Sequence, residues 1–315
     1  MKAAYFMRFG GPEVMEYGDV PDPVAGAGEV LVDVHAASVN GADWKMRSGR
    51  YTQITSFPYV PGRDFSGVVS ALGDGVRDLR AGDPVFGVCD VGHDGAYAEK
   101  VAIKAALVAR KPGSLSHAEC AAIALTGLTA LVSIEDTLEL QRGERILVQG
   151  GAGGVACMAI QIAKQRGAHV ITTTSAANID YVRGLGADEV IDYGVQDFTQ
   201  VVAPCDAVFD TVGGDVAKRS FAVLKPGGRA AFIASGYVLP PPPRDDVAAL
   251  RPDVRRDRAH LERLLALVAS GALRVPGITT YRFADAAAAQ RVSEGRHLRG
   301  KLVFQVRPSY LAANS

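Results

Sequence analysis

The chain has 315 residues, of which 48% are hydrophobic, and its 34 basic and 34 acidic residues cancel to a net charge of zero. This length and composition permit a globular protein with two domains. They exclude a chain drawn as a whole to nucleic acid or to an anionic membrane. We therefore expect a small-molecule substrate, with no nucleic-acid and no membrane partner.

The N-terminal segment "MKAAYFMRFGGPEV" lacks the apolar core of a secretory signal. No later run reaches membrane-spanning length free of charge or glycine. These features predict a cytoplasmic protein.

The cysteines stand far apart and form no Cys-x-x-Cys pair: Cys89, Cys120, Cys157 and Cys205. This spacing argues against a disulfide framework and against a zinc lobe held by four thiolates. We expect buried free thiols.

The first hundred or so residues contain short β-type runs separated by turn signals such as "GDGVRDLRAGD". These runs lie at Glu29–Ser38, Phe65–Leu72, Asp83–Cys89 and Ala96–Ile103. They predict a compact, mostly β domain.

From Ser116 onward the pattern becomes helical and then alternates between strands and helices. Ser116 and Glu119 have the spacing of a capping box before an apolar run. The strands expected after that helix are "RILVQ", "HVITTT", "EVIDY", "DAVFDTV" and "RAAFIA", with a helical segment after each of the first four. This order predicts a parallel sheet covered on both faces, which binds ligands at the carboxyl ends of its strands.

The last part of the chain returns to β-type sequence. The proline-rich "YVLPPPPRDD" predicts an extended loop, a helix follows in "RAHLERLLALVASGAL", and the β-like "GITTYRF" and "GKLVFQV" come last. We therefore expect the parallel-sheet domain to be inserted into the β domain. The expected limits are residues 1–120 and 261–315 for the β domain and 121–260 for the inserted one.

A glycine-rich turn follows the strand "RILVQ" and reads Gly150-x-x-Gly153-x-x-Ala156. Two glycines let the backbone turn tightly and approach a pyrophosphate, which the N–H groups at the helix start can bind. The third position needs only a small residue for helix packing, so Ala156 can serve. Between an apolar strand and an apolar-faced helix, this turn predicts a dinucleotide site.

The second strand of this unit ends without the acid that usually accepts the ribose 2′-hydroxyl of NAD. Threonines and Ser175 stand there instead. A carboxylate would repel a 2′-phosphate and hydroxyls can donate to one, so the sequence favours NADP. The stretch contains no arginine or lysine to pair with that phosphate.

Several motifs in order resemble the medium-chain dehydrogenase/reductase superfamily, and within it the zinc-free quinone oxidoreductases related to zeta-crystallin. They include "ASVNGADWKMRSGRY", "PYVPGRDFSGVV", "GGAGGVA", "LGADEVIDY", "DTVGG" and "LRGKLVFQV". The resemblance covers nearly the whole chain. It implies an α/β fold with a GroES-like β domain and a Rossmann doubly wound parallel sheet domain.

Zinc-dependent alcohol dehydrogenases, which the chain also resembles, carry a cysteine in the position of Asn40. They carry Gly-His-Glu in the positions of Gly62, Arg63 and Asp64. Catalytic zinc needs three protein ligands, and here only Asp64 could bind the metal. The six histidines are scattered without ligand spacing. We therefore expect no metal.

Without a metal, the expected reaction is transfer of hydride from NADPH to a quinone or an α,β-unsaturated carbonyl. The oxyanion that develops in such an acceptor needs only hydrogen-bond donors or water. Two alternatives stay open: a pathway-specific enoyl reductase, and a dinucleotide-binding redox sensor or structural protein with little catalysis. A methyltransferase using S-adenosylmethionine shares the glycine turn but would not explain the β domain.

The resemblance also implies site residues. As catalytic residues it points to Asn40 beside the nicotinamide ribose, Tyr51 in the substrate cleft, and Thr129, which like Thr126 lies on the helix after Ser116. Asp43 is expected to brace the loop of Asn40, with Arg47 or Arg63 as candidate partners. The residues expected to bind the cofactor are Asn40, Thr129, Gly150, Ala152, Gly153, Gly154, Val155, Ser175, Tyr193, Val212, Ala234, Ser235 and Lys301.

The chain departs from its relatives at two positions. Lys45 replaces a second cleft tyrosine found in some members, which puts the quinone specificity in question. Ala177 replaces a lysine or arginine that many members carry near the 2′-phosphate. Family members commonly pair through the edge of the Rossmann sheet, so the resemblance also implies a homodimer.

Overall fold

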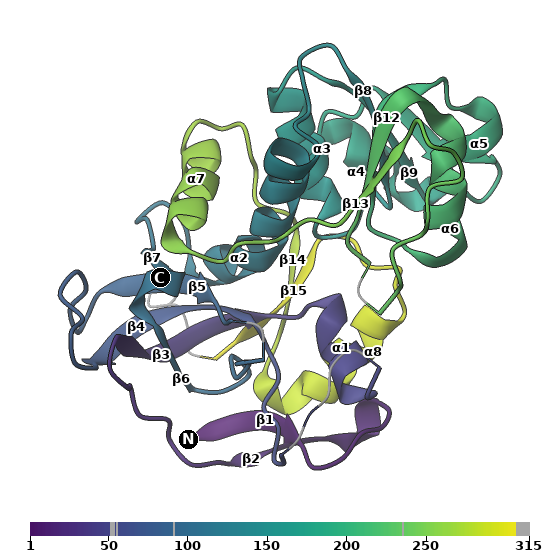
Figure 1. Cartoon of the computed structure of the whole chain (residues 1–315). Coiled ribbons are helices and arrows are strands. Elements are labelled where there is room, and N and C mark those ends of the chain that lie inside the picture. Colours follow the sequence, from purple (N-terminus) through teal and green to yellow (C-terminus); the bar gives the residue numbers. More distant parts are fainter. Residues whose placement is uncertain (51–53, 55, 91, 235, 307–315) are drawn as a thin grey trace. The chain divides into compact units, whose positions relative to one another are not determined.

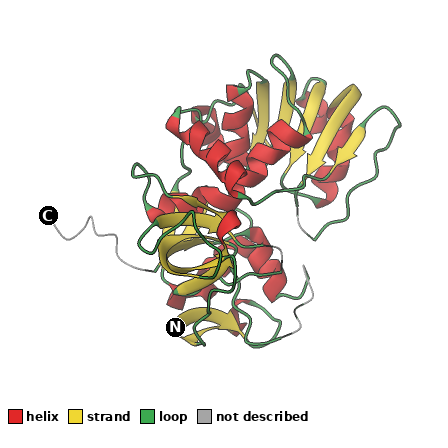
Figure 2. Cartoon of the chain, turned by 60° about the vertical axis from the view of Figure 1, so that its left-hand side comes forward, coloured by secondary structure: helices red, strands yellow, loops and turns green. Residues whose placement is uncertain are grey.

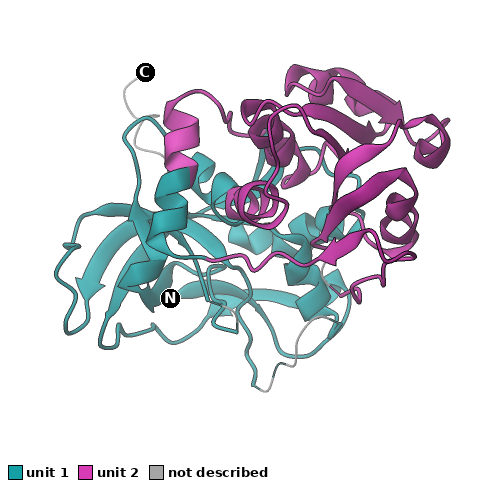
Figure 3. Cartoon of the chain, turned by 45° about the horizontal axis from the view of Figure 1, so that its top comes forward, with its two compact units in different colours: residues 1–125, 256–263, 277–315 teal, residues 126–255, 264–276 magenta. Residues whose placement is uncertain are grey.

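The computed structural model of the chain describes residues 1–50, 54, 56–90, 92–234 and 236–306 (Figure 1). The chain divides into two compact units, coloured separately in Figure 3. Unit 1 comprises residues 1–125, 256–263 and 277 onward, and unit 2 comprises residues 126–255 and 264–276. Each unit is described below by itself.

Unit 1 is built on a mixed sheet. Within the described residues its strand order is β14-β15-β3-β4-β5-β7, and β6 pairs with β3 off this path. These strands are β3 (Glu29–Ser38), β4 (Asp64–Leu72), β5 (Pro84–Val88), β6 (Lys100–Lys104), β7 (Val108–Arg110), β14 (Ile278–Tyr281) and β15 (Lys301–Gln305). The hairpin of β1 (Lys2–Phe6) and β2 (Met15–Asp19) forms a separate two-stranded sheet, which an isolated bridge between Ala3 and Ala98 links to the segment before β6, and it was not foreseen from the sequence.

Strand β3 is the centre of unit 1 because it pairs with β4, β6 and β15. Its alternation of buried and partly exposed residues is the period of two that predicted a strand here. Val30, Val32 and Val34 are fully buried in the main core of the unit. Gly67 of β4 is required by this pairing, since a Cβ there would lie 2.1 Å from the carbonyl oxygen of Asp33.

Two helices of unit 1 were missed by sequence reasoning: α1 (Gly41–Arg47) and α8 (Ala286–Glu294). They are packed against each other through a fully buried Arg47 on α1. Its guanidinium donates to Gln290 Oε1 and Glu294 Oε2 of α8, both at 2.8 Å. Such long-range partners leave no local signal in the sequence.

The capping box predicted at Ser116 is confirmed. Ser116 N donates to Glu119 Oε2 at 2.8 Å, and Glu119 N donates to Ser116 Oγ at 3.2 Å. The helix α2 (His117–Leu131) follows and continues as a π-helix over Val132–Thr137. Together they are long and apolar enough to cross a membrane, but 78% of the most apolar stretch is buried in the fold, as in the core helix of a globular protein.

Unit 2 contains the parallel sheet that the sequence predicted. All neighbouring strands are parallel, in the order β10-β9-β8-β11-β12-β13 within the described residues. The strands are β8 (Arg145–Gln149), β9 (His169–Thr174), β10 (Glu189–Asp192), β11 (Cys205–Asp210), β12 (Leu224–Phe232) and β13 (Ala248–Leu250). The strand order reverses between β8 and β11, and a crevice at such a switch point is where doubly wound sheets bind ligands.

Helices follow the strands of unit 2 as the sequence predicted, and Figure 2 shows them beside the sheet. They are α3 (Ala156–Gln165), α4 (Ile179–Gly184), α5 (Phe198–Val201) and α6 (Gly214–Arg219). A later helix, α7 (Arg258–Ala269), contains the division between the two units. The core of unit 2 includes Leu147, Ile171 and Val208 from three adjacent strands, all fully buried. The four cysteines are free and buried, which confirms that expectation.

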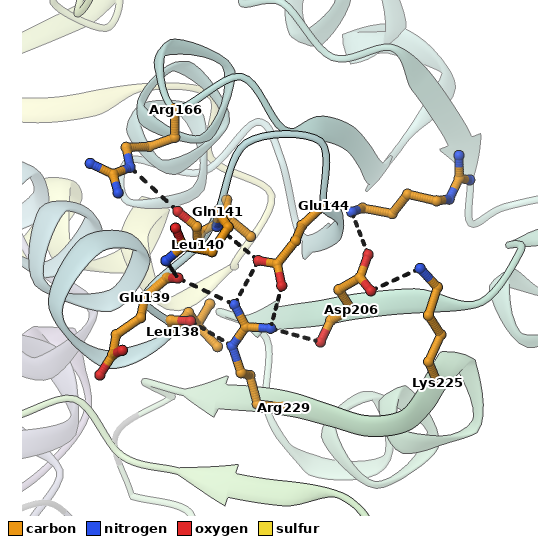
Figure 4. Close-up of polar contacts among 10 residues, drawn as sticks. Leu138, Glu139, Leu140, Gln141, Glu144, Arg166, Asp206, Lys225 and Arg229 are labelled. Atoms are coloured by element: carbon orange, nitrogen blue, oxygen red, sulfur yellow. Dashed lines mark hydrogen bonds and ion pairs between the residues drawn. The ribbon is translucent and has the colours of Figure 1, made fainter.

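Polar contacts around Arg229 of β12 join neighbouring segments at the amino-terminal end of this sheet (Figure 4). Its guanidinium donates to both carboxylate oxygens of Glu144, at 3.0 and 2.7 Å, and its Nε donates to Leu138 O at 2.5 Å. Asp206 accepts from Lys225 Nζ at 2.8 Å. Because ligands bind at the opposite, carboxyl ends of parallel strands, we interpret this cluster as structural.

Candidate functional site

The glycine turn of unit 2 connects the end of β8 to α3. Gly150 has a φ of 76°, a left-handed conformation that glycine adopts without strain. A Cβ at Gly151 would lie 2.2 Å from Thr172 Oγ1, so the turn packs tightly on β9. Ala156 begins α3 and is fully buried, in keeping with the packing role expected of the third position.

The space at Gly153 differs from that at Gly151. A Cβ at Gly153 would meet only the carbonyl oxygen of Gly150, at 3.4 Å. The protein itself therefore does not require a glycine at this position. A pyrophosphate approaching the backbone would require one, so the turn fits a dinucleotide.

The threonines of β9 do not have the role that the sequence predicted. Thr172 Oγ1 donates to Val148 O at 2.7 Å, and Thr173 Oγ1 donates to Gln149 Oε1 at 2.7 Å. Thr173 Oγ1 also accepts from Gly150 N at 3.1 Å. These buried hydroxyls bond to the turn and to the strand before it, so they do not donate to a 2′-phosphate.

Ser175 is the first hydroxyl after β9 that is partly exposed. Its Oγ accepts from Asn178 Nδ2 at 3.2 Å, which leaves the hydroxyl proton for another acceptor. Tyr193 follows the neighbouring strand β10 and is 51% exposed. Since Thr174 pairs with Asp192, Ser175 and Tyr193 leave the sheet side by side. Asn178 gave no signal in the sequence analysis.

The turn after β11 lies against the glycine turn. A Cβ at Gly150 would be 3.1 Å from Val212 Cγ2. Val212 is 38% exposed, and Ala234 follows β12, whose Phe232 pairs with Asp210. The structure thus places Val212 and Ala234 with the glycine turn at the carboxyl end of the sheet, as predicted. Ser235 lies outside the described residues.

A buried carboxylate that the sequence analysis missed holds this second turn. Asp210 accepts from Gly213 N at 2.8 Å and from Val212 N at 3.3 Å. Burial raises the pKa of Asp210 to about 6, and the two hydrogen bonds act against that rise. The ring of Tyr237 covers the turn, since a Cβ at Gly213 would lie 2.7 Å from its Cδ2.

The threonines predicted on α2 are buried. Thr126 is 4% exposed and Thr129 is 9% exposed. Thr129 O accepts from Ser133 Oγ at 2.6 Å, at the junction with the π-helix. Single π turns inside helices frequently occur at functional sites. The role of Thr129 as a cofactor contact stays a prediction.

The polar centre of unit 1 forms around Asn40, which precedes α1. Asn40 Nδ2 donates to Asp64 Oδ1 at 2.7 Å, and Asn40 Oδ1 accepts from Lys301 Nζ at 2.9 Å. Lys301 also donates to Val39 O at 2.9 Å. Asn40 and Lys301 are 7% and 2% exposed, so Lys301 is buried and orients the Asn40 amide. Tyr51 lies outside the described residues.

This arrangement does not fit a catalytic zinc ion. Asn40 and Asp64 stand where the resemblance places two metal ligands, and they are hydrogen-bonded to each other. Arg63 stands in the position of the third ligand and pairs with Asp94 at 3.2 Å. Among the residues that the structure describes, no three His, Cys, Asp or Glu side chains gather as a metal site.

Asp43 braces the start of α1, and its hydrogen-bond donors were not foreseen from the sequence. Its Oδ2 accepts from Asn40 N at 2.8 Å and from Tyr97 OH at 2.6 Å. Burial raises the pKa of Asp43 to about 7, against these two hydrogen bonds. Of the two expected partners, Arg47 is used by α8 instead, whereas the charge of Arg63 does act on Asp43 and favours its ionised form.

Comparisons with known proteins identify the family. Residues 26–113 match the model of the alcohol dehydrogenase GroES-like domain, and residues 185–304 match that of the zinc-binding dehydrogenase. The chain is 33% identical to an NADPH-dependent alkenal/one oxidoreductase of Arabidopsis thaliana, over 96% of this chain and 79% of the relative. It is 36% identical to a 2-methylene-furan-3-one reductase of Solanum lycopersicum, over 76% of this chain but only 64% of that relative.

Solved structures agree with this assignment. A quinone oxidoreductase from Coxiella burnetii is 34% identical, with a TM-score of 0.87 over 98% of this chain and 99% of that one. The quinone oxidoreductase of Escherichia coli, solved in complex with NADPH, is 28% identical with a TM-score of 0.88 over 97% of this chain and 100% of that one. The chain belongs to the medium-chain dehydrogenase/reductase superfamily, among its zinc-free quinone oxidoreductases. The predicted GroES-like and Rossmann-type fold is confirmed.

The comparisons contradict the expected cytoplasmic location. The Arabidopsis relative is named as a chloroplastic protein, and a 36% identical oxidoreductase of Danio rerio is named as mitochondrial. The expectation rested on the lack of an apolar N-terminal segment. That criterion detects secretory signals but not the arginine- and serine-rich transit peptides of organelles.

Proposed function

We propose that this chain is an NADPH-dependent, zinc-independent oxidoreductase that reduces quinones or α,β-unsaturated carbonyls. The observation that carries the proposal is the glycine turn at the switch point of the unit 2 sheet. No close contact within the protein requires a glycine at Gly153, whereas a bound pyrophosphate would require one. The hydrogen bond between Asn40 and Asp64, where a metal would otherwise need ligands, supports a reaction without zinc.

The residues proposed to hold NADPH are those at the strand ends of unit 2, together with three from elsewhere. Ser175 donates to the 2′-phosphate, with Tyr193 beside it. The N–H groups of the glycine turn bind the pyrophosphate because they begin helix α3. The full proposed set is Asn40, Thr129, Gly150, Ala152, Gly153, Gly154, Val155, Ser175, Tyr193, Val212, Ala234, Ser235 and Lys301.

When bound, NADPH supplies the hydride that reduces the acceptor. The chain's own residues position the cofactor and the acceptor and stabilise the oxyanion that develops on the acceptor. Lys301 and Asp64 fix the Asn40 amide from both sides, so that this residue keeps one orientation. Asn40, Tyr51 and Thr129 are proposed as the residues nearest the reacting atoms. Holding the cofactor and the acceptor in attack geometry is worth several orders of magnitude in rate.

A homodimer is also proposed, through the edge of the unit 2 sheet. Strand β13 is one of the two edge strands of that sheet, and β10 is the other. Among the described strands β13 pairs with β12 alone, which leaves its outer side for a second copy. Light scattering on the purified chain tests this. A mass of twice the chain supports the dimer, and a monomer at micromolar concentration contradicts it.

The function is tested by mixing the purified chain with NADPH and a panel of quinones and enones while following the absorbance of the reduced nicotinamide. We expect turnover with at least one acceptor, and faster turnover with NADPH than with NADH. Saturable NADPH binding without oxidation by any acceptor would refute the enzyme and favour a dinucleotide-binding protein.

A further inference from the structure

The connection from β9 to α4 contains two polar side chains that bond to each other (Figure 1). Asn178 Nδ2 donates to Ser175 Oγ at 3.2 Å, and Asn178 N donates to Ser175 O at 2.9 Å. Both residues are partly exposed. The connection begins where β9 ends, at the carboxyl end of the unit 2 sheet, which is the end that binds ligands.

Helix capping does not explain this pair. Ser175 is the N-cap of the 3-10 helix Ala176–Asn178, and Asn178 is the N-cap of α4. Serine and asparagine are favoured at N-caps because their side-chain oxygens accept from backbone N–H groups. Within the part of the chain that the structure describes, neither of these side chains makes a capping hydrogen bond. The orientation of the two side chains is therefore not set by the need to begin a helix.

The hydrogen bond between the side chains determines where the Ser175 hydroxyl proton points. A serine hydroxyl has one proton to donate, whereas its oxygen can also accept. Because Asn178 Nδ2 donates to Ser175 Oγ, the hydroxyl proton is not used in this bond. Among the described residues it meets no other acceptor. Asn178 thus occupies the accepting side of the hydroxyl and leaves its donating side for a ligand.

The space around Ser175 is open to a ligand. Ala176 and Ala177, which follow it, are exposed and carry only methyl groups. Tyr193 N donates to Thr174 O at 3.1 Å, which places Tyr193 beside Ser175, and its side chain is 51% exposed. A group bound next to the Ser175 hydroxyl therefore meets small side chains on one side and a tyrosine on the other.

No cation of this connection is available to such a group. Residues 175–182 contain no lysine or arginine, and their one carboxylate, Asp180, pairs with Arg183 at 3.8 Å. An anion bound beside Ser175 would therefore be held here by neutral hydrogen-bond donors. Recognition by neutral donors depends on their direction, because no opposite charge attracts the anion from every side. The residue that sets the direction of the Ser175 hydroxyl then determines how well the anion is bound.

We propose that Asn178 is a positioning residue for cofactor selection, which directs the Ser175 hydroxyl proton toward the 2′-phosphate of NADPH. The inference rests on the proposed function, because it assigns a role within the proposed NADPH site. A carboxylate at position 178 would reverse the preference. It would accept the Ser175 proton and repel a 2′-phosphate, and it could accept from the ribose 2′-hydroxyl of NADH.

The test measures the binding of adenosine 2′,5′-bisphosphate and of AMP by calorimetry, at one pH and one salt concentration. The two probes differ only in the 2′-phosphate, so the ratio of their Kd values isolates that group. The preference for the bisphosphate is expected to fall about tenfold in Asn178→Ala and about 100-fold in Asn178→Asp. Aspartate is as good an N-cap as asparagine, so Asn178→Asp is expected to keep α4 intact.

Two controls separate positioning from other effects. Gln165→Glu makes the same change of charge at the exposed last residue of α3, at the opposite end of the sheet, and is expected to leave the preference unchanged. In a Ser175→Ala background, Asn178→Ala is expected to cause no further fall, because residues that act through each other are not additive. A full further fall in that double variant would give Asn178 a phosphate contact of its own and would overturn the positioning role.

The remaining outcomes distinguish this inference from the proposed function. The inference is overturned by a wild type that does not prefer the bisphosphate, by a wild-type preference in both Asn178 variants, or by an equal fall in Gln165→Glu. If the predicted changes in preference are seen but no acceptor is reduced, the proposed reductase activity fails and the role of Asn178 stands. If acceptors are reduced with NADPH while both Asn178 variants keep the wild-type preference, the enzyme stands and the role of Asn178 fails.

Discussion

Replacing Gly153 by alanine distinguishes a glycine required for cofactor binding from one required for folding. The added Cβ meets only Gly150 O, at 3.4 Å, and Gly153 is not in the left-handed region. A glycine-to-alanine change at such a position stabilises a protein by about 0.4–1 kcal/mol, because it restricts the unfolded chain. We therefore expect the free energy of unfolding of Gly153→Ala to stay equal or to rise slightly.

The same methyl group is expected to weaken NADPH binding. In the proposed binding mode it would stand where the pyrophosphate approaches the backbone N–H groups, and a charged hydrogen bond of that kind is worth about 1.5–3 kcal/mol. Losing one such bond raises the Kd about 10- to 100-fold, since about 1.4 kcal/mol corresponds to a factor of ten. Fluorescence titration with NADPH measures the Kd, and urea denaturation measures the stability.

The neighbouring Gly151→Ala is the matched comparison. Its Cβ would lie 2.2 Å from Thr172 Oγ1, whose hydroxyl is bonded to Val148 O. Overpacking of this kind costs about 1–3 kcal/mol, so this variant is expected to lose stability. NADPH binding to Gly153→Ala at wild-type strength would refute the reasoning, because the glycine would then have no role toward the cofactor.

Three further outcomes are expected. Ser175→Ala should raise the Kd for NADPH about tenfold and leave that for NADH unchanged, and an equal effect on both cofactors would remove Ser175 from the 2′-phosphate site. Arg229→Met should lower the free energy of unfolding by about 2–3 kcal/mol in urea without changing the NADPH Kd, since it breaks the contacts with Glu144 and Leu138 at the far end of the strands. Burial, and then the charges of His35 and Lys111, lower the pKa of His117 from 6.5 to about 4. The unfolded chain therefore binds a proton at His117 more readily than the folded protein, so the wild type loses stability as the pH falls from 6.5 to about 4. The loss is at most about 3 kcal/mol and nearer 1–2 because His117 is half-exposed, and urea midpoints of His117→Gln should fall less over the same window.

Local patterns in the sequence predicted the elements that carry the dinucleotide site. The strand, glycine turn, helix and second strand from Arg145 to Thr174 are present as expected, because each depends on periodicity and turn residues within a short window. The parallel order of the sheet follows from the alternation of strands and helices. The hairpin of β1 and β2 was missed, because its residues "MKAAYF" and "MEYGD" show only weak alternation.

The side-chain contacts of the site could not be predicted in the same way. The sequence shows that hydroxyls end β9, but the direction of Thr172 and Thr173 toward the turn depends on the paired strand β8. Lys301 and Asn40 are separated by 261 residues, so their hydrogen bond has no local signal. The role of Asp210 likewise arises from the two N–H groups that follow it in the folded turn.

The most direct test of the central claim follows the transferred hydrogen. The purified chain is dialysed against a metal chelator and incubated with an enone and NADPH deuterated at the transferable nicotinamide position. Mass spectrometry is expected to find deuterium on the β-carbon of the saturated product, at a rate equal to that of the undialysed chain. A product without deuterium, or a rate that is lost on chelation and restored by zinc, would contradict the account.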